Sequence, residues 1–312
     1  MASLSAEVFS LHTFLHPNAE AYVNHSSVTV LSGADALKHL DRSLTSTISD
    51  IENLDKRQSL LCDANGRIVD MVSICYFESQ IILFGWKDST SKQKLLQGIG
   101  WNEDVELFDA DRTISNISIV GNSCNRVLVG LGIDASEFSQ NSWVEYGNAL
   151  LSVRLENNIE IFEVALPTVE LESFLKLLVE NGCSIIEKNR WKSLRMQIGI
   201  LEMPDLFGNL PLEVGLDDWV MLDKGCYPGQ EVHARLESRG RVAKSLMRLD
   251  CESELECGKL KIEGIGTINI TSTSLFDDSV IAFALLPSSA CELECININD
   301  TNTAFLRRIR NH

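Results

Sequence analysis

The stretch KGCYPGQEVHAR, residues 224–235, decides how the rest of this chain is interpreted. It places Cys226 two residues after Lys224, among two glycines and a proline, with Arg235 at its end. A cysteine acts as a nucleophile, metal ligand or redox group only as the thiolate, and a nearby cation favours that form. Glycine and proline shape tight turns. The stretch therefore predicts a functional thiol on a constrained loop. The alternative is a buried structural cysteine, because free cysteine is among the most buried residue types.

The surroundings of this stretch are basic, whereas the chain is acidic. The formal net charge is -17, which opposes non-specific attraction to nucleic acid or to anionic membranes. Residues 224–248 nevertheless carry six Lys or Arg against two Glu, a local net charge of +4. This basic island indicates an anionic ligand or partner. The alternative is a solvated strand face with alternating charges.

The composition is that of a folded, reduced protein. The chain has 312 residues and 45% apolar residues, enough for about two domains. Its nine cysteines contain no C-x-x-C pair, and the odd count argues against a disulfide framework. The first residues show no pattern of a signal or transit peptide, and no apolar run reaches the ~18 residues of a membrane span. We expect a soluble protein of a reducing compartment, the cytoplasm.

The pattern of apolar residues predicts an α+β fold, because helices and hairpins are mixed rather than strictly alternating. Residues 33–48 place leucines at helical spacing behind Asp35, and residues 58–77 read as two strands joined at Asn65 and Gly66. Residues 167–182 predict the clearest helix, opened by a proline and closed by Asn-Gly, and residues 187–200 predict a second one.

The pattern of apolar and turn-forming residues changes near Gly240. After Val242, short strand-like segments alternate with Gly, Asp and Ser, and no helix is indicated. We therefore expect a body over residues 1–240, of two lobes that need not be continuous in sequence. Residues 241–312 should form a small β-barrel or sandwich.

Other side chains give weaker signals. Glu213, in LPLEVGL, lies between apolar residues, and a carboxylate there can accept two parallel N–H bonds from a pterin or guanine ring; taken alone, such a residue is more often on the surface. Cys291 and Cys295 share one strand face, but two cysteines do not complete a zinc site, so core packing is favoured. No metal site is predicted.

The string KGCYPGQEVHAR, with RGRVAKSLMRL after it and LPLEVGL before it, resembles the YgfZ family of folate-binding proteins, relatives of the glycine-cleavage T-protein. Weaker matches in LSGADALKHLDRSLTSTI, LLCDANGRIVD and LRMQIGI extend the resemblance over almost the whole chain. The resemblance implies a two-lobed α+β body and a C-terminal barrel around a central cavity that takes tetrahydrofolate. It also implies a role in maturing or repairing iron–sulfur enzymes, including those that modify tRNA, which would be transient partners.

The resemblance also implies roles for individual residues. Glu213 corresponds to the carboxylate at the pterin edge, Cys226 to the functional thiol, and Lys224 and Arg235 to its cationic neighbours. Arg195 is the candidate for the glutamate tail of folate. The remaining residues expected around the ligand and the loop are Tyr227, Gln230 and Glu231, the last two fixing the loop by hydrogen bonds.

Three functions are open at this point. The first is a folate-dependent accessory factor for iron–sulfur enzymes. The second is a one-carbon transferase of the T-protein type, an aminomethyltransferase. T-protein relatives carry an Asn-Ala pair after the third strand, where this chain has QIILFGWKDST, which disfavours that chemistry. The third is an RNA-binding module, which the total negative charge disfavours because phosphate contacts need many cations.

Overall fold

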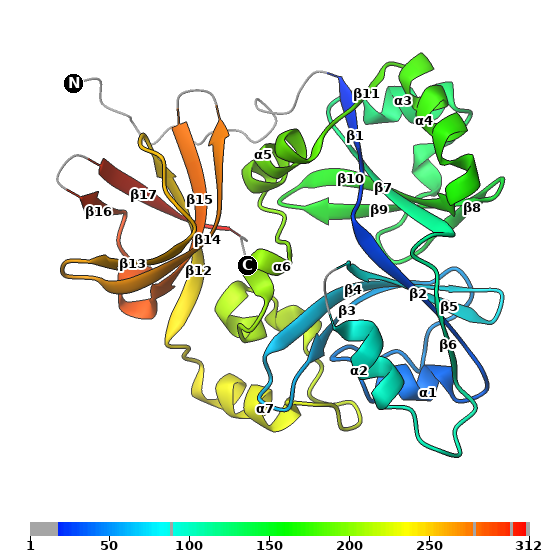
Figure 1. The fold of residues 1–312 in the computed structure, drawn as a ribbon, viewed down its shortest axis with the longest axis horizontal. Helices are drawn as coiled ribbons and strands as arrows, with labels where there is room; N and C mark the ends of the chain where they lie inside the picture. Colours follow the sequence, from blue (N-terminus) through cyan, green and yellow to red (C-terminus); the bar gives the residue numbers. More distant parts are fainter. Residues whose placement is uncertain (1–17, 88–89, 277–278, 300–301, 310–312) are drawn as a thin grey trace.

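The computed structural model describes residues 18–87, 90–276, 279–299 and 302–309, which form three β-sheets and the helices packed against them (Figure 1). The first sheet has the strand order β11 (Cys183–Ile185), β1 (Ala19–Val23), β7 (Ile114–Val120), β10 (Ile159–Pro167), β9 (Ala149–Glu156) and β8 (Val144–Tyr146). The second has the order β3 (Lys56–Cys62), β4 (Ile68–Phe77), β5 (Gln80–Trp86), β2 (Ser26–Ser32) and β6 (Glu106–Asp109). The third has the order β13 (Gly258–Ile262), β14 (Gly266–Phe276), β15 (Ser279–Pro287), β12 (Lys244–Cys251), β17 (Asn302–Arg308) and β16 (Cys295–Asn299). The helices are α1 (Ala36–Asp41), α2 (Ser91–Gln97), α3 (Cys124–Gly130), α4 (Leu171–Glu180), α5 (Lys188–Ile198), α6 (Met203–Leu206) and α7 (Gln230–Arg239).

The first two sheets exchange chain segments. β1 pairs with β7 in the first sheet, and the chain then crosses directly to β2 in the second. β7 brings it back to the first sheet, where it pairs with β10. Because each sheet holds strands from separate parts of the chain, the two sheets fold as one body with a shared apolar boundary, which includes Phe84 and the fully buried Trp143.

The predicted hairpin and the two predicted helices are confirmed. Gly66 has φ +73° at the turn between β3 and β4, which pair antiparallel. α4 follows a short 3-10 turn and buries Phe174 and Leu178 against the first sheet, as the 3.6-residue spacing predicts. α5 ends at Gly199, whose φ of +92° closes the helix.

The helix predicted over residues 33–48 is shorter than its apolar spacing indicates. α1 ends at Asp41, whose carboxylate accepts hydrogen bonds from the backbone N–H groups of Ile48 and Ser49 at 2.7 and 3.1 Å. Leu44 instead forms a bridge to Leu61 and is fully buried. Tertiary pairing with the second sheet therefore overrides local helix propensity here.

The C-terminal segment, for which we expected a small β-barrel or sandwich, is a curled half-barrel sheet. The mixed α/β content is confirmed, but the edge strands β13 and β16 are not paired with each other. Closure requires the two edge strands to pair, and both are short and mostly exposed. β12 begins at Lys244, and the domain boundary near residue 240 stays a prediction.

One helix was not expected from the sequence. α7 covers most of the second half of the KGCYPGQEVHAR stretch and continues to Arg239. Gly229 with φ +84° precedes it, and Gly240 with φ +59° follows it. Figure 1 shows α7 beside the turn of the β3–β4 hairpin.

Candidate functional site

A cavity of about 620 Å³ lies where the three sheets meet. Its walls come from β4, β5, β7, β9, β10 and β14, from the β1–β2 crossing, and from α5 with the segment that follows it. Its volume falls within the ~300–1,000 Å³ range of small-molecule sites. The aromatic residues in its wall are Tyr22, Phe84, Trp86, Trp143, Trp191 and Trp219. Such a wall suits a flat, partly apolar ligand.

One buried carboxylate in this wall is held as an anion. Glu163, on β10, forms an ion pair with Lys56 of β3, whose side chain is 1% exposed. The Arg154 Nε atom lies 3.6 Å from the second oxygen of Glu163. Burial raises the pKa of Glu163, but Lys56 and Arg154 outweigh it and hold that pKa below its ordinary value. The ion pair also joins the first sheet to the second.

The cavity wall carries a second polar network, centred on Arg195. This arginine is 1% exposed and lines the cavity. It pairs with the fully buried Asp205 at 2.9 Å and with Glu202 at 2.9 Å, and it donates to the Ile200 carbonyl at 3.0 Å and to the Ser272 hydroxyl at 2.9 Å. The N–H groups of Arg195 thus form hydrogen bonds and ion pairs within the protein itself. Its predicted role at the glutamate tail stays a prediction.

A β-bulge completes that network. The register between β14 and β15 shifts between Ile270 and Ser272. The bulge directs the hydroxyls of Thr271 and Ser272 to the same oxygen of Asp205, at 2.7 and 2.6 Å. The third sheet is therefore fastened to α5 and α6 at the edge of the cavity.

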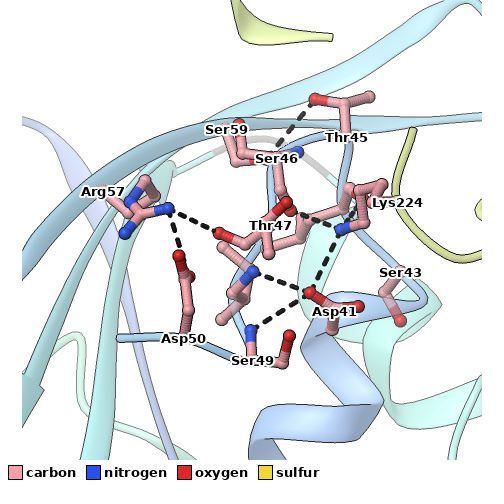
Figure 2. A network of polar contacts seen from close by, with 12 residues as sticks. Asp41, Ser43, Thr45, Ser46, Thr47, Ser49, Asp50, Arg57, Ser59 and Lys224 are labelled. Carbon is pink, nitrogen blue, oxygen red and sulfur yellow. Dashed lines mark hydrogen bonds and ion pairs between the residues drawn. The ribbon is translucent and has the colours of Figure 1, made fainter. Parts of the chain in front are cut away.

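Cys226 is exposed and does not line this cavity. Lys224 belongs to the polar network around Asp41 that Figure 2 shows: its ammonium group donates to the carbonyls of Leu44 and Ser46 and lies 3.4 Å from Asp41. The Lys224 side chain is 3% exposed. Burial lowers the pKa of Lys224, and Asp41 opposes that shift. Lys224 therefore anchors the loop that presents the cysteine. Its predicted role as a cationic neighbour of the thiol stays a prediction.

Two other side chains hold the same loop. Gln230 donates to the carbonyls of Leu222 and Lys224 at 3.1 and 3.4 Å. Tyr227 is buried, and its hydroxyl lies 3.3 Å from Nδ1 of the buried His233. His233 Nε2 lies 2.8 Å from the Gly66 carbonyl, so the loop is tied to the β3–β4 hairpin.

The remaining predicted residues lie apart from the cavity. Glu231 and Arg235 form an exposed pair 3.7 Å apart on α7, with side chains 89% and 73% exposed. Glu213 is buried, accepts from the Leu210 N–H at 2.9 Å and lies 3.6 Å from Lys244. It does not line the cavity. Their predicted roles in ligand binding stay predictions, and the contacts of Glu213 are those of a helix cap.

The basic island of the sequence is divided by the fold. Lys224 is buried, Lys244 contacts Asn209 at 2.8 Å, and Arg248 pairs with Asp250 at 2.7 Å. The island's exposed cations lie on α7 or just after it: Arg235, Arg239 and Arg241. The six cations of the island therefore do not all lie on one surface.

Glu163, Lys56, Arg154 and Glu202 are cavity or junction residues that sequence reasoning missed. The available signal was Glu163 in IEIFEVALP, where a carboxylate interrupts an otherwise apolar strand. Its partner Lys56 is distant in sequence, and no local pattern joins the two.

We expect Gly229→Ala to lower the free energy of unfolding by about 2 kcal/mol, the cost of a side chain in the left-handed region together with a clash. A Cβ at this position would meet Gly66 Cα at 2.3 Å. Gly225→Ala is the matched control, because a Cβ at Gly225 has no atom within 4 Å. Urea unfolding followed by circular dichroism measures both. Equal stability of the two variants would contradict the close contact between loop and hairpin.

We expect the free energy of unfolding to fall as the pH drops below about 6.5. Burial lowers the pKa of both His39 and His233 below 6.5 in the folded protein. Below about pH 6.5 the unfolded chain therefore binds more protons than the folded protein. Each histidine changes the free energy of unfolding by at most about 1.4 kcal/mol per pH unit. Urea unfolding at pH 7.5 and 5.5 measures the difference in the free energy of unfolding between the two pH values. The variant His39→Gln should show a smaller difference than the wild type. An unchanged difference in that variant would contradict the assignment.

Within the described ranges, no three His, Cys, Asp or Glu side chains are grouped so that they could hold a metal ion. In the same part of the chain, no helix has the length and apolar character needed to span a bilayer.

The chain is similar to two curated proteins and to one solved structure over most of its length. It is 24% identical over 239 residues to the tRNA-modifying protein YgfZ of Blochmanniella pennsylvanica, covering 70% of this chain and 68% of that protein. It is 22% identical over 244 residues to an aminomethyltransferase of Thermoanaerobacter pseudethanolicus, covering 71% of this chain and 64% of that protein. The chain thus matches about two thirds of the length of these relatives. No protein-family model matches it.

The structural match extends further along the chain. The crystal structure of glycine cleavage system aminomethyltransferase T from Bartonella henselae superposes with a TM-score of 0.79, 15% identity, and coverage of 95% of this chain and 86% of that one. This match shows that the chain has the fold of that aminomethyltransferase T. The similarity to the two curated proteins agrees with the resemblance to the YgfZ family and the T-protein that the KGCYPGQEVHAR string indicated.

Proposed function

We propose that the chain binds tetrahydrofolate, or a derivative of it, in the junction cavity and acts as an accessory factor in the assembly or repair of iron–sulfur enzymes. Enzymes that modify tRNA are among the expected clients. The observation that carries the proposal is the cavity with an aromatic wall and one buried, ionised carboxylate, Glu163. The name of one relative, a tRNA-modifying protein, supports the class of client.

Glu163 suits the pterin end of a folate. A pterin ring presents an amino group beside a ring N–H, and a carboxylate accepts both in parallel. One oxygen of Glu163 pairs with Lys56, and the other has no hydrogen bond within the described residues. In a cavity shielded from water, such a charge-assisted pair gives both affinity and orientation. Glu163 thus takes the role that the sequence resemblance implied for Glu213.

The thiol acts outside the cavity in this proposal. Cys226 is exposed on a loop that Lys224 and Gln230 anchor, so it is accessible to another protein. A single cysteine does not hold a stable iron–sulfur cluster, because such clusters usually need about four protein ligands. Contact with a client through Cys226 is therefore transient in this proposal. The folate site and the thiol are two separate sites.

Two measurements test this function. Titration with tetrahydrofolate should quench tryptophan fluorescence saturably, because four tryptophans line the cavity. Cys226→Ala should keep that binding but fail to restore cluster-dependent tRNA methylthiolation in a deletion strain. Cys295→Ala, which also removes an exposed thiol, should restore it. Absence of folate binding would reject the ligand, and full rescue by Cys226→Ala would reject the role of the thiol.

The second candidate is a tetrahydrofolate-dependent aminomethyltransferase, favoured by the similarity to the aminomethyltransferase of T. pseudethanolicus. An aminomethyl-lipoyl carrier and tetrahydrofolate should then yield methylenetetrahydrofolate and ammonia. If the protein binds folate but does not catalyse this reaction, the aminomethyltransferase function is rejected and the function as an accessory factor stands.

A further inference from the structure

An exposed tryptophan lies on the connection between α2 and β6, residues 98–105. The Trp101 side chain is 99% exposed, and Leu96, near the end of α2, is 57% exposed. This connection runs along the lower right edge of the molecule in Figure 1. Tryptophan is among the residues that contribute most to the binding energy of protein interfaces, whereas single exposed leucines are common on any surface. Trp101 is therefore a candidate contact for another molecule.

The turn that carries Trp101 is firmly held, although the side chain is exposed. The Glu103 N–H donates to the Gly100 carbonyl at 3.1 Å, and the Gly100 N–H donates to the Glu103 carboxylate at 2.6 Å. The guanidinium group of Arg42, the residue after α1, donates to both oxygens of that carboxylate at 2.5 Å. The hydrogen bonds from Arg42 and from Gly100 lower the pKa of Glu103 to about 2, so the carboxylate is ionised at neutral pH.

The residue after this turn joins it to the chain that follows β2. The Asp35 N–H donates to the Asp104 carbonyl at 3.1 Å, and the Ala34 N–H donates to the Asp104 carboxylate at 3.0 Å. The Asp104 N–H in turn donates to the Asp35 carboxylate at 3.1 Å. A Cβ at Gly33 would lie 2.1 Å from the Asp104 carbonyl oxygen, so the two segments are in direct contact. The Trp101 turn is thus preorganised, and a partner does not have to order it, which lowers the free-energy cost of association.

The surface around the turn is negative. Residues 91–111, which include α2, the turn and β6, carry five carboxylates against two lysines, and Arg42 leaves a local net charge of -2. Asp104 and Glu106 are exposed, and no ion pair joins either of them to a cation within the described residues. An indole face also attracts Lys and Arg side chains. The surface therefore favours a cationic partner.

The neighbouring edge strand indicates the shape of that partner. β6 is the last strand of the second sheet, and in the described part of the chain no strand pairs with its outer edge. An extended segment can add to such an edge through backbone hydrogen bonds. Pairing of β6 with β6 of a second copy is disfavoured, because it would bring acidic side chains together.

We propose that Trp101 and the outer edge of β6 form a docking surface for a basic, extended segment of a partner protein. A Lys or Arg side chain of that segment stacks on the indole of Trp101, and further cations pair with Asp104 and Glu106. The inference does not depend on the proposed folate function, because this surface shares no residue with the wall of the junction cavity.

Fluorescence anisotropy with a fluorescein-labelled octapeptide of alternating Arg and Ser tests the surface, at physiological ionic strength so that distant charges are screened. We expect saturable binding that Trp101→Ala weakens by about tenfold or more and Glu106→Gln by about threefold. Phe305→Ala is the control for the first variant, because Phe305 is a 44% exposed aromatic side chain of the third sheet. Glu256→Gln is the control for the second, because Glu256 is an exposed carboxylate before β13. Neither control should change the affinity by more than about twofold. Circular dichroism verifies that each variant is folded.

Three results would overturn this docking surface. The first is absence of saturable peptide binding, or equal losses of affinity in Trp101→Ala and Phe305→Ala. The second is a dimer in analytical ultracentrifugation that Trp101→Ala dissociates, which would assign the surface to a second copy of the chain. The third is cosedimentation with phosphatidylcholine–phosphatidylserine vesicles that is lost in Trp101→Ala, which would assign the surface to a membrane.

Discussion

Arg195→Met should lower the free energy of unfolding by about 3–5 kcal/mol, which is the cost of breaking a buried ion pair by removing one partner. Asp205 is fully buried and would be left without its cation, although it would keep the hydroxyls of Thr271 and Ser272. The loss is large because this network joins α5 and α6 to the third sheet. Urea unfolding followed by circular dichroism measures it.

Arg308→Met is the control for this change. Its ion pair with Glu292 is exposed, so we expect a change within about 0.5 kcal/mol. Similar stabilities of Arg195→Met and wild type, together with weaker folate binding, would show that Arg195 serves a ligand rather than the fold. That result would support the role implied by sequence resemblance and reject the structural one.

Glu163→Gln should weaken tetrahydrofolate binding by about 10- to 100-fold, because a neutral amide replaces the charged acceptor of two parallel hydrogen bonds. Glutamine has nearly the same shape as glutamate, so the cavity keeps its volume. Tryptophan fluorescence titration gives the affinity. A thermal melt of each variant verifies the fold, since Lys56 loses its counter-charge in this protein.

Glu213→Gln is the matched variant, because Glu213 is equally buried but does not line the cavity. We expect its tetrahydrofolate affinity to stay within about twofold of wild type, as for a change that removes no ligand contact. The opposite result would be weaker tetrahydrofolate binding by Glu213→Gln and unchanged binding by Glu163→Gln. It would identify Glu213 as the pterin carboxylate and place the ligand outside the junction cavity.

Local sequence patterns predicted the elements whose shape depends on nearby residues. The spacing of Leu171, Phe174 and Leu178 specifies a helix that buries one face, and Asn65 with Gly66 specifies a tight hairpin. The prediction was wrong over residues 42–48, where Leu44 pairs with Leu61 in the second sheet. For the C-terminal β-barrel the prediction was confirmed in part: the strands form a curled half-barrel sheet whose edge strands are not paired with each other.

Charges were harder to interpret than apolar spacing. The cations near Cys226 in the sequence form one basic island, but the fold turns Lys224 inward to Asp41 and leaves Arg235 exposed on α7. Proximity along the chain therefore did not predict proximity to the thiol. A charged side chain goes where its desolvation is compensated, and the compensating partner is often distant in sequence.

By itself, the sequence indicated a resemblance to the YgfZ family, through the string around Cys226, and predicted the mixed α/β character of the chain. The tertiary structure alone decided which side chains enclose the cavity, because Glu163 and Lys56 are 107 residues apart and meet only when two sheets pack together. Helix and turn patterns arise from interactions between neighbours. A binding site is built from residues whose only relation is that the fold brings them to the same place.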